Sequence, residues 1–109
     1  MSSQDERRAQ NENTFREANE QIKAAGDQLR PPLERTPYVC ECADVACREL
    51  VTLTVEEYEE VRADGRRFLV APGHEHDSEV VEEHAGWAVV VKEGVAGAVA
   101  SEKNPRRAV

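Results

Sequence analysis

Apolar side chains recur at spacings of three and four residues in an otherwise polar stretch from residue 5 to residue 29. This spacing is typical of a helix with one apolar face. We expect the helix to end before Pro31, because proline lacks the backbone donor that continues a helix. The apolar face could pack on the rest of the chain or on a partner helix, including one from a second copy. Its positions are Phe15, Ala18, Ile22, Ala25 and Leu29.

Shorter patterns follow, and most of them indicate β-strands. Apolar and β-branched residues between turn signals predict strands at residues 38–41, 49–53, 68–71, 78–83 and 87–92. Thr54 and Glu57 have the spacing of a capping box, which predicts a short helix that ends near Ala63. The expected fold class is α+β, with a small antiparallel sheet and one short helix after a long N-terminal amphipathic helix.

These elements divide the chain into four parts. We expect an N-terminal helix at residues 1–30, a proline-rich linker at 31–37, a folded domain at 38–93 and a flexible C-terminal tail at 94–109. Gly94 and Gly97 are the reason for expecting a flexible tail. Only 39% of the residues are hydrophobic, so the core is small. Small domains often depend on a metal or a disulfide for stability.

The three cysteines of the chain, Cys40, Cys42 and Cys47, form a C-x-C-x4-C motif. In an extended segment residues i and i+2 point the same way, so the first two thiols can face one ion. The loop that follows can return the third thiol to the same place. Clustered thiolates with a histidine further along the chain are typical of a structural zinc site. We therefore expect the sheet to be held together by zinc.

A closed zinc site needs a fourth ligand, and three histidines are available. His74 follows a Pro-Gly turn, His76 would serve equally if the strand extended past that turn, and His84 is the weakest candidate because it lies in a hairpin turn. An odd number of thiols argues against a disulfide, and an iron–sulfur cluster prefers four cysteines. The Pro-Gly pair also excludes the helix on which an H-E-x-x-H metalloprotease places its ligands. No catalytic residues are predicted, and we do not expect an enzyme.

The net charge is −8, and residues 40–85 contain 13 acidic and 4 basic residues. Nucleic acids and anionic membranes are bound mainly through lysine and arginine, so neither is an expected partner. No apolar run approaches the ~20 residues that span a bilayer. The N-terminal residues also lack the apolar segment of a secretory signal. We expect a cytoplasmic location, where thiols stay reduced.

Three stretches carry longer motifs: C-E-C-x4-C at residues 40–47, L-T-x-x-E-Y-E-x-V-R at 53–62 and R-F-x-V-x-P-G-H at 67–74. Together they resemble a family of small uncharacterised bacterial proteins common in actinobacteria, and residues 11–22 and 87–92 are similar to that family as well. The resemblance favours His74 as the fourth ligand, because P-G-H closes the shared run, and it implies no activity. Where the family often has Asp-Pro before the last cysteine, this chain has Asp44, Val45 and Ala46. That difference could loosen the loop, but it removes no ligand.

Two functions remain as hypotheses. The closed zinc site, the acidic surface and the separate helix favour a zinc-stabilised adaptor or regulatory module that binds an unknown protein partner. The alternative is a thiol sensor whose cysteines release zinc on oxidation. Both hypotheses use Zn2+ as the cofactor and the same predicted ligands, Cys40, Cys42, Cys47 and His74.

Overall fold

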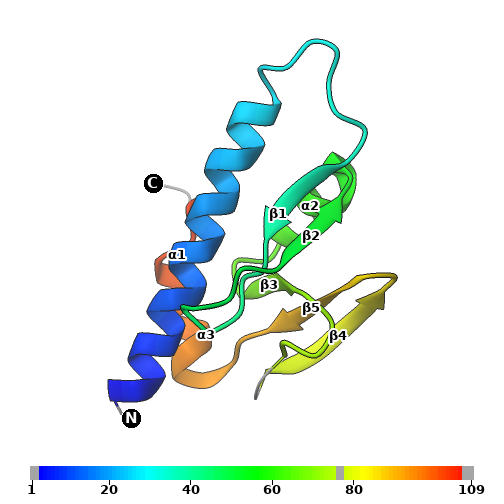
Figure 1. Ribbon diagram of the computed structural model, residues 1–109. Helices are drawn as coiled ribbons and strands as arrows, with labels where there is room; N and C mark the ends of the chain where they lie inside the picture. Colours follow the sequence, from blue (N-terminus) through cyan, green and yellow to red (C-terminus); the bar gives the residue numbers. More distant parts are fainter. Residues whose placement is uncertain (1–2, 76–77, 107–109) are drawn as a thin grey trace.

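The computed structural model describes residues 3–75 and 78–106 and confirms the α+β fold class. The strands form two antiparallel sheets, one with the order β1–β2 and one with the order β3–β5–β4. The long helix α1 lies along one side of the molecule, beside β1 and α3 (Figure 1). The elements are α1 (Ser3–Gly26), β1 (Thr36–Val39), β2 (Leu50–Leu53), α2 (Val55–Arg62), β3 (Arg67–Val70), β4 (Glu79–His84), β5 (Trp87–Val91) and α3 (Gly94–Glu102).

The hydrophobic core joins the two sheets to α2. Tyr38 of β1 stacks on Tyr58 of α2, with ring centroids 4.3 Å apart, and both side chains are fully buried. Phe68 of β3 is fully buried as well. The central strand β5 is buried from Trp87 to Val90, whereas the edge strand β4 is mostly exposed and carries several glutamates. Charged residues on an exposed edge oppose pairing with a strand of another chain.

The capping box predicted before α2 is present. The Thr54 hydroxyl accepts a hydrogen bond from the Glu57 backbone N–H at 3.1 Å, and the Glu57 carboxylate accepts one from the Thr54 backbone N–H at 2.8 Å. Two backbone donors that the first turn would otherwise leave unpaired are therefore satisfied. The helix ends at Arg62, with Ala63 as its C-cap.

The helix α1 forms as predicted, but the face that it turns toward the rest of the protein is polar. Ile22 packs against the core, as expected, whereas Ala18 and Ala25 of the predicted apolar face are exposed. Packing of the apolar face on the rest of the chain, one of the two alternatives, is therefore wrong for most of its positions, and packing on a partner helix stays a prediction. The buried residues of α1, among those described, are Ala9, Glu12, Asn13, Arg16 and Asn19.

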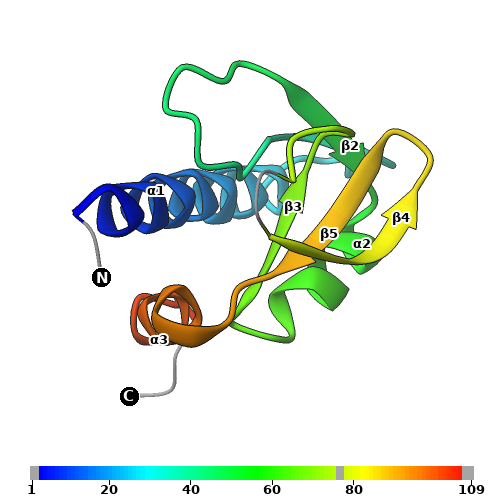
Figure 2. The ribbon, with the colours of Figure 1, turned by 90° about the horizontal axis from the view of Figure 1, so that it is seen from below.

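The C-terminal segment is not the flexible tail predicted from residue 94. Residues Gly94–Glu102 form α3, which packs beside α1 (Figure 2). The two glycines suggested a flexible tail. However, alanine, the best helix former, recurs along α3, and Gly97 has a packing role. A Cβ atom at Gly97 would lie 2.6 Å from the backbone oxygen of Lys92. Beyond α3, Arg106 pairs with Glu20 and Glu59, so the chain is held to α1 and α2 as far as residue 106.

Candidate metal centre

Cys40, Cys42 and Cys47 come from the end of β1 and the loop that follows it. Cys40 and Cys42 continue the extended direction of β1 and are both buried. The loop then turns at Asp44, whose carboxylate accepts a hydrogen bond from the Ala46 N–H at 2.9 Å and whose carbonyl accepts one from the Cys47 N–H at 3.0 Å. A side-chain bond of this kind is typical of aspartate in a tight turn. The turn directs the third thiol back toward the first two.

His74 is positioned by a turn at the end of β3. The His74 N–H donates to the carbonyl oxygen of Ala71 at 3.0 Å, which closes a four-residue turn. Pro72 and Gly73 occupy its two central positions, and Gly73 has a φ of 84°. Proline followed by glycine with a positive φ is the pattern of a type II turn. The P-G-H sequence thus has a direct structural purpose, because it turns the imidazole toward the cysteines.

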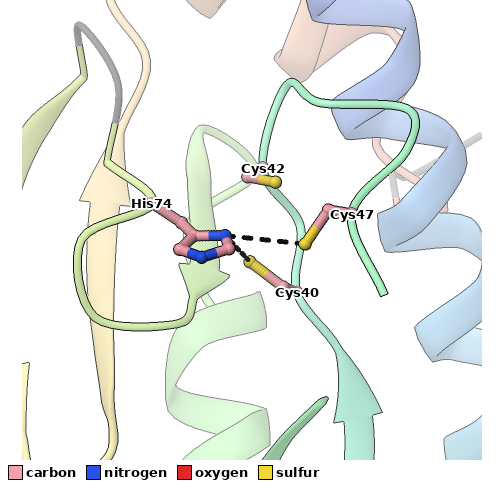
Figure 3. Close-up of side chains that lie close together, drawn as sticks. All are labelled: Cys40, Cys42, Cys47 and His74. Carbon is pink, nitrogen blue, oxygen red and sulfur yellow. Dashed lines mark hydrogen bonds between the residues drawn. The ribbon is translucent and has the colours of Figure 1, made fainter. Parts of the chain in front are cut away.

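Cys40, Cys42, Cys47 and His74 lie close enough together to bind a metal ion. Their ligand atoms all lie within 4.8 Å of one another (Figure 3). The Nδ1 atom of His74 is 3.6 Å from Sγ of Cys40 and 3.5 Å from Sγ of Cys47. The Ala71 N–H also donates to Sγ of Cys40 at 3.2 Å, which would stabilise negative charge on that sulfur.

Burial sets the chemistry of these thiols. Desolvation raises the pKa of Cys40 and of Cys42, although backbone hydrogen bonds at each sulfur act in the opposite direction. Without a cation the two thiols therefore stay protonated near neutral pH, and a protonated thiol is a poor nucleophile. A bound metal ion would supply the charge that stabilises the thiolates. The arrangement suits metal binding better than metal-free thiol chemistry.

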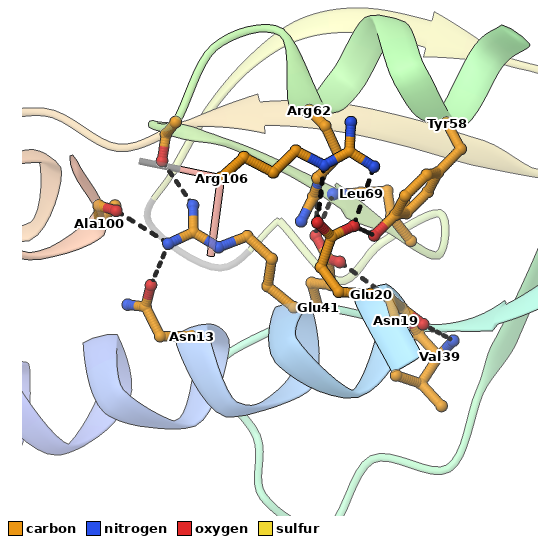
Figure 4. Close-up of polar contacts among 12 residues, drawn as sticks. Asn13, Asn19, Glu20, Val39, Glu41, Tyr58, Arg62, Leu69, Ala100 and Arg106 are labelled. Atoms are coloured by element: carbon orange, nitrogen blue, oxygen red, sulfur yellow. Dashed lines mark hydrogen bonds and ion pairs between the residues drawn. The ribbon is translucent and has the colours of Figure 1, made fainter. Parts of the chain in front are cut away.

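Glu41, which lies between the two buried cysteines, is the main residue that the sequence reasoning missed. It is fully buried and pairs with Arg62 of α2 at 2.6 Å. It also accepts hydrogen bonds from the side chain of Asn19 at 2.7 Å and from the Leu69 N–H at 3.0 Å (Figure 4). The sequence could have indicated a separate role for Glu41, because side chains alternate along an extended segment. Glu41 therefore points away from the face that carries Cys40 and Cys42.

Of the other two histidines, the structure describes His84, which does not join this group. His76 lies outside the described residues. His84 is at the end of β4, where its ring stacks on Trp87 with centroids 4.0 Å apart and its Nε2 lies 3.0 Å from Glu82. Of the two candidates that the structure describes, His74 is the one that lies beside the thiols.

Comparisons with protein families, with curated proteins and with solved structures find no match to this chain. The resemblance to the actinobacterial family therefore stays a prediction. Among the described residues, no helix is both long and apolar enough to cross a membrane.

Proposed function

We propose that this chain is a zinc-stabilised module that binds another protein as an adaptor or regulator. The grouping of three cysteine sulfurs and one histidine nitrogen is the observation that carries the zinc half of the proposal. In a tetrahedral site with Zn–S bonds of ~2.3 Å and a Zn–N bond of ~2.05 Å, sulfur and nitrogen are separated by about 3.6 Å. Nδ1 of His74 lies 3.6 Å from Sγ of Cys40 and 3.5 Å from Sγ of Cys47, which supports a tetrahedral zinc ion.

The ligand set favours a structural role for the metal. Three thiolates and one imidazole would fill a tetrahedral site, whereas a catalytic zinc keeps one position for water or substrate. Cys40 and Cys42 are buried, and the Ala71 N–H donates to Cys40. The ion would join the β1–β2 loop to the turn after β3, two segments that belong to different sheets. Zinc would thus hold the two sheets together.

Metal analysis of the purified protein tests this half. We expect one zinc per chain in the wild type and in His76→Ala and His84→Ala, and a loss of zinc in His74→Ala. Chelation should lower the free energy of unfolding by about 4 kcal/mol, measured against protein at a zinc concentration a thousand times the dissociation constant. Protein that contains no zinc and unfolds at the same temperature with and without zinc would contradict the proposal.

The protein-binding half rests on charge. Glu56 and Glu60 of α2 and Glu79 and Glu83 of β4 are exposed, so the domain offers acidic surfaces to a partner with basic residues. Opposite charge favours association and selects among partners. We expect zinc-loaded protein to recover a partner that is released at high salt and lost in Glu56→Lys/Glu60→Lys. Equal recovery by the wild type and this variant would exclude the α2 surface as the contact.

A thiol sensor is the second candidate, favoured by the partial exposure of Cys47. Two zinc-bound thiolates would give two electrons to hydrogen peroxide and form a disulfide, two protons would complete two water molecules, and Zn2+ would leave. Peroxide should then release zinc from the wild type and leave two fewer free thiols in each chain. Zinc that stays bound while peroxide oxidises a control thiol would exclude this function.

A further inference from the structure

The residues that carry the first two predicted zinc ligands also hold α1 in place. We call residues 39–43 the shared segment. One side of it presents Cys40 and Cys42 to the other predicted ligands. Its backbone and the side chain of Glu41 face α1, α2 and β3. The predicted metal site and the helix α1 therefore share the same five residues, on different sides of the segment.

Asn19 of α1 makes three hydrogen bonds to the shared segment. Its Oδ1 accepts from the Val39 N–H at 2.8 Å, and its Nδ2 donates to the Val39 carbonyl oxygen at 2.8 Å and to the Glu41 carboxylate at 2.7 Å (Figure 4). The amide thus pairs with both backbone groups of one residue, as a neighbouring strand would. Asn19 is fully buried, so these bonds are shielded from water.

Asn11 fixes the far end of the shared segment, because its Nδ2 donates to the Ala43 carbonyl oxygen at 3.2 Å. The two asparagines are eight residues apart along α1. The residues that they contact, Val39 and Ala43, lie on either side of the two cysteines in the segment. The Glu41 N–H donates to the Leu69 carbonyl oxygen at 2.8 Å, which ties the middle of the segment to β3. The backbone geometry at Cys40 and Cys42 therefore depends on α1 as well as on the sheet.

We propose that zinc binding and the docking of α1 are coupled through the shared segment, with Asn19 and Glu41 as positioning residues for the metal site. This inference rests on the proposed zinc site. When zinc leaves, residues 40–43 lose their attachment to Cys47 and His74, and the geometry that Asn19 and Asn11 require is weakened. When α1 detaches, Cys40 and Cys42 are no longer held at the spacing that the ion requires. Side chains that orient metal ligands typically change metal affinity 10- to 100-fold when they are replaced.

Coupling of this kind is reciprocal. If docked α1 raises zinc affinity by a given factor, zinc must stabilise the docking of α1 by the same factor. Two independent measurements, one on the wild type and one on a variant of α1, should therefore both show the coupling, and that agreement would not follow if each residue merely contributed to overall stability.

The first measurement is amide hydrogen exchange of the full chain, with zinc and after chelation. Because chelation also lowers the free energy of unfolding of the whole chain, exchange should accelerate in both sheets, and we expect the interior amides of α1 to accelerate about tenfold more than the amides of β5, at the centre of the other sheet. Unchanged exchange in α1 would overturn the coupling. Equal acceleration in α1 and β5 would overturn it too, because the metal would then act on the whole fold.

The second measurement is zinc affinity by competition with a chromophoric chelator. We expect Asn19→Ala to bind zinc about tenfold more weakly than the wild type. Gln21→Ala, at an exposed position of α1, and Thr54→Ala, which removes a cap far along the chain from Asn19, should bind zinc as the wild type does. Wild-type affinity in Asn19→Ala would overturn the coupling while leaving the zinc site intact. A wild-type protein that binds no zinc would overturn both. If Asn19→Ala does not fold, the exchange measurement on the wild type still decides.

Discussion

The buried ion pair between Arg62 and Glu41 gives the sharpest prediction for stability. The two side chains are 1% and 0% exposed, and Nη2 of Arg62 lies 2.6 Å from Oε1 of Glu41. Replacing Arg62 with methionine keeps a long side chain in place, so no large cavity forms. It leaves the Glu41 carboxylate in the interior with hydrogen-bond donors but without its cation. The substitution therefore isolates the charge rather than the packing.

The magnitude follows from two opposing effects. Removing one partner of a buried ion pair typically destabilises a protein by about 3–5 kcal/mol. However, Nε and Nη1 of Arg62 have no hydrogen-bond partner among the described residues, so the substitution also removes two unsatisfied donors. We therefore expect Arg62→Met to lower the free energy of unfolding by about 3 kcal/mol, the lower end of this range. In a domain of roughly this size that corresponds to a decrease in Tm of about 12 °C.

Urea unfolding of zinc-saturated protein measures the effect, with the fluorescence of the single, buried Trp87 as the signal. Arg67→Met is a matched control, since its exposed pair with Glu82 should contribute less than about 1 kcal/mol. The substitution Glu41→Gln, made in both backgrounds, should lower the free energy of unfolding by about 2 kcal/mol less in Arg62→Met than in the wild type. If the effect of Glu41→Gln differs between the two backgrounds by less than about 0.5 kcal/mol, the reasoning is refuted, because the two charges would then not stabilise each other in the folded protein.

Three further substitutions probe other parts of the fold. Gly97→Ala should destabilise the protein by at least about 1 kcal/mol, measured by urea unfolding, because its Cβ would meet a backbone oxygen at 2.6 Å. Thr54→Ala should cost about 1 kcal/mol through loss of the α2 cap. Burial alone would raise the pKa of Glu20, but hydrogen bonds from Arg106 and Tyr58 outweigh it and leave the pKa lowered from 4.5. The stability advantage of the wild type over Glu20→Gln should therefore be full above about pH 4.5 and disappear as the pH falls below the folded-state pKa. An advantage that grows in acid would contradict this.

Local signals predicted the parts of the fold that depend on neighbouring residues. The capping box at Thr54 and the turn at Gly86 between β4 and β5 act within a few positions of the chain, so the sequence reveals them directly. The meeting of His74 with the cysteines was predictable because each lies on a turn with its own signature. The helix α3 was missed, because the requirement for Gly97 comes from Lys92 and the backbone path between them, which no local pattern reveals.

The polar face of α1 was missed for a different reason. An apolar stripe predicts burial only where the surface beneath it is apolar, and the surface beneath α1 contains backbone groups that find their hydrogen-bond partners in side chains of α1. Arg16 donates to the carbonyl oxygens of Gly65 at 2.5 Å and Ala100 at 2.8 Å, and Asn19 pairs with both backbone groups of Val39. An apolar face laid over these groups would leave them buried without partners, at about 1–3 kcal/mol for each. The docking face had to be polar once α1 covered the edge of β1 and the end of α3. The arrangement is therefore set by the backbone beneath the helix, and the shared segment is the part of that backbone on which zinc would also act.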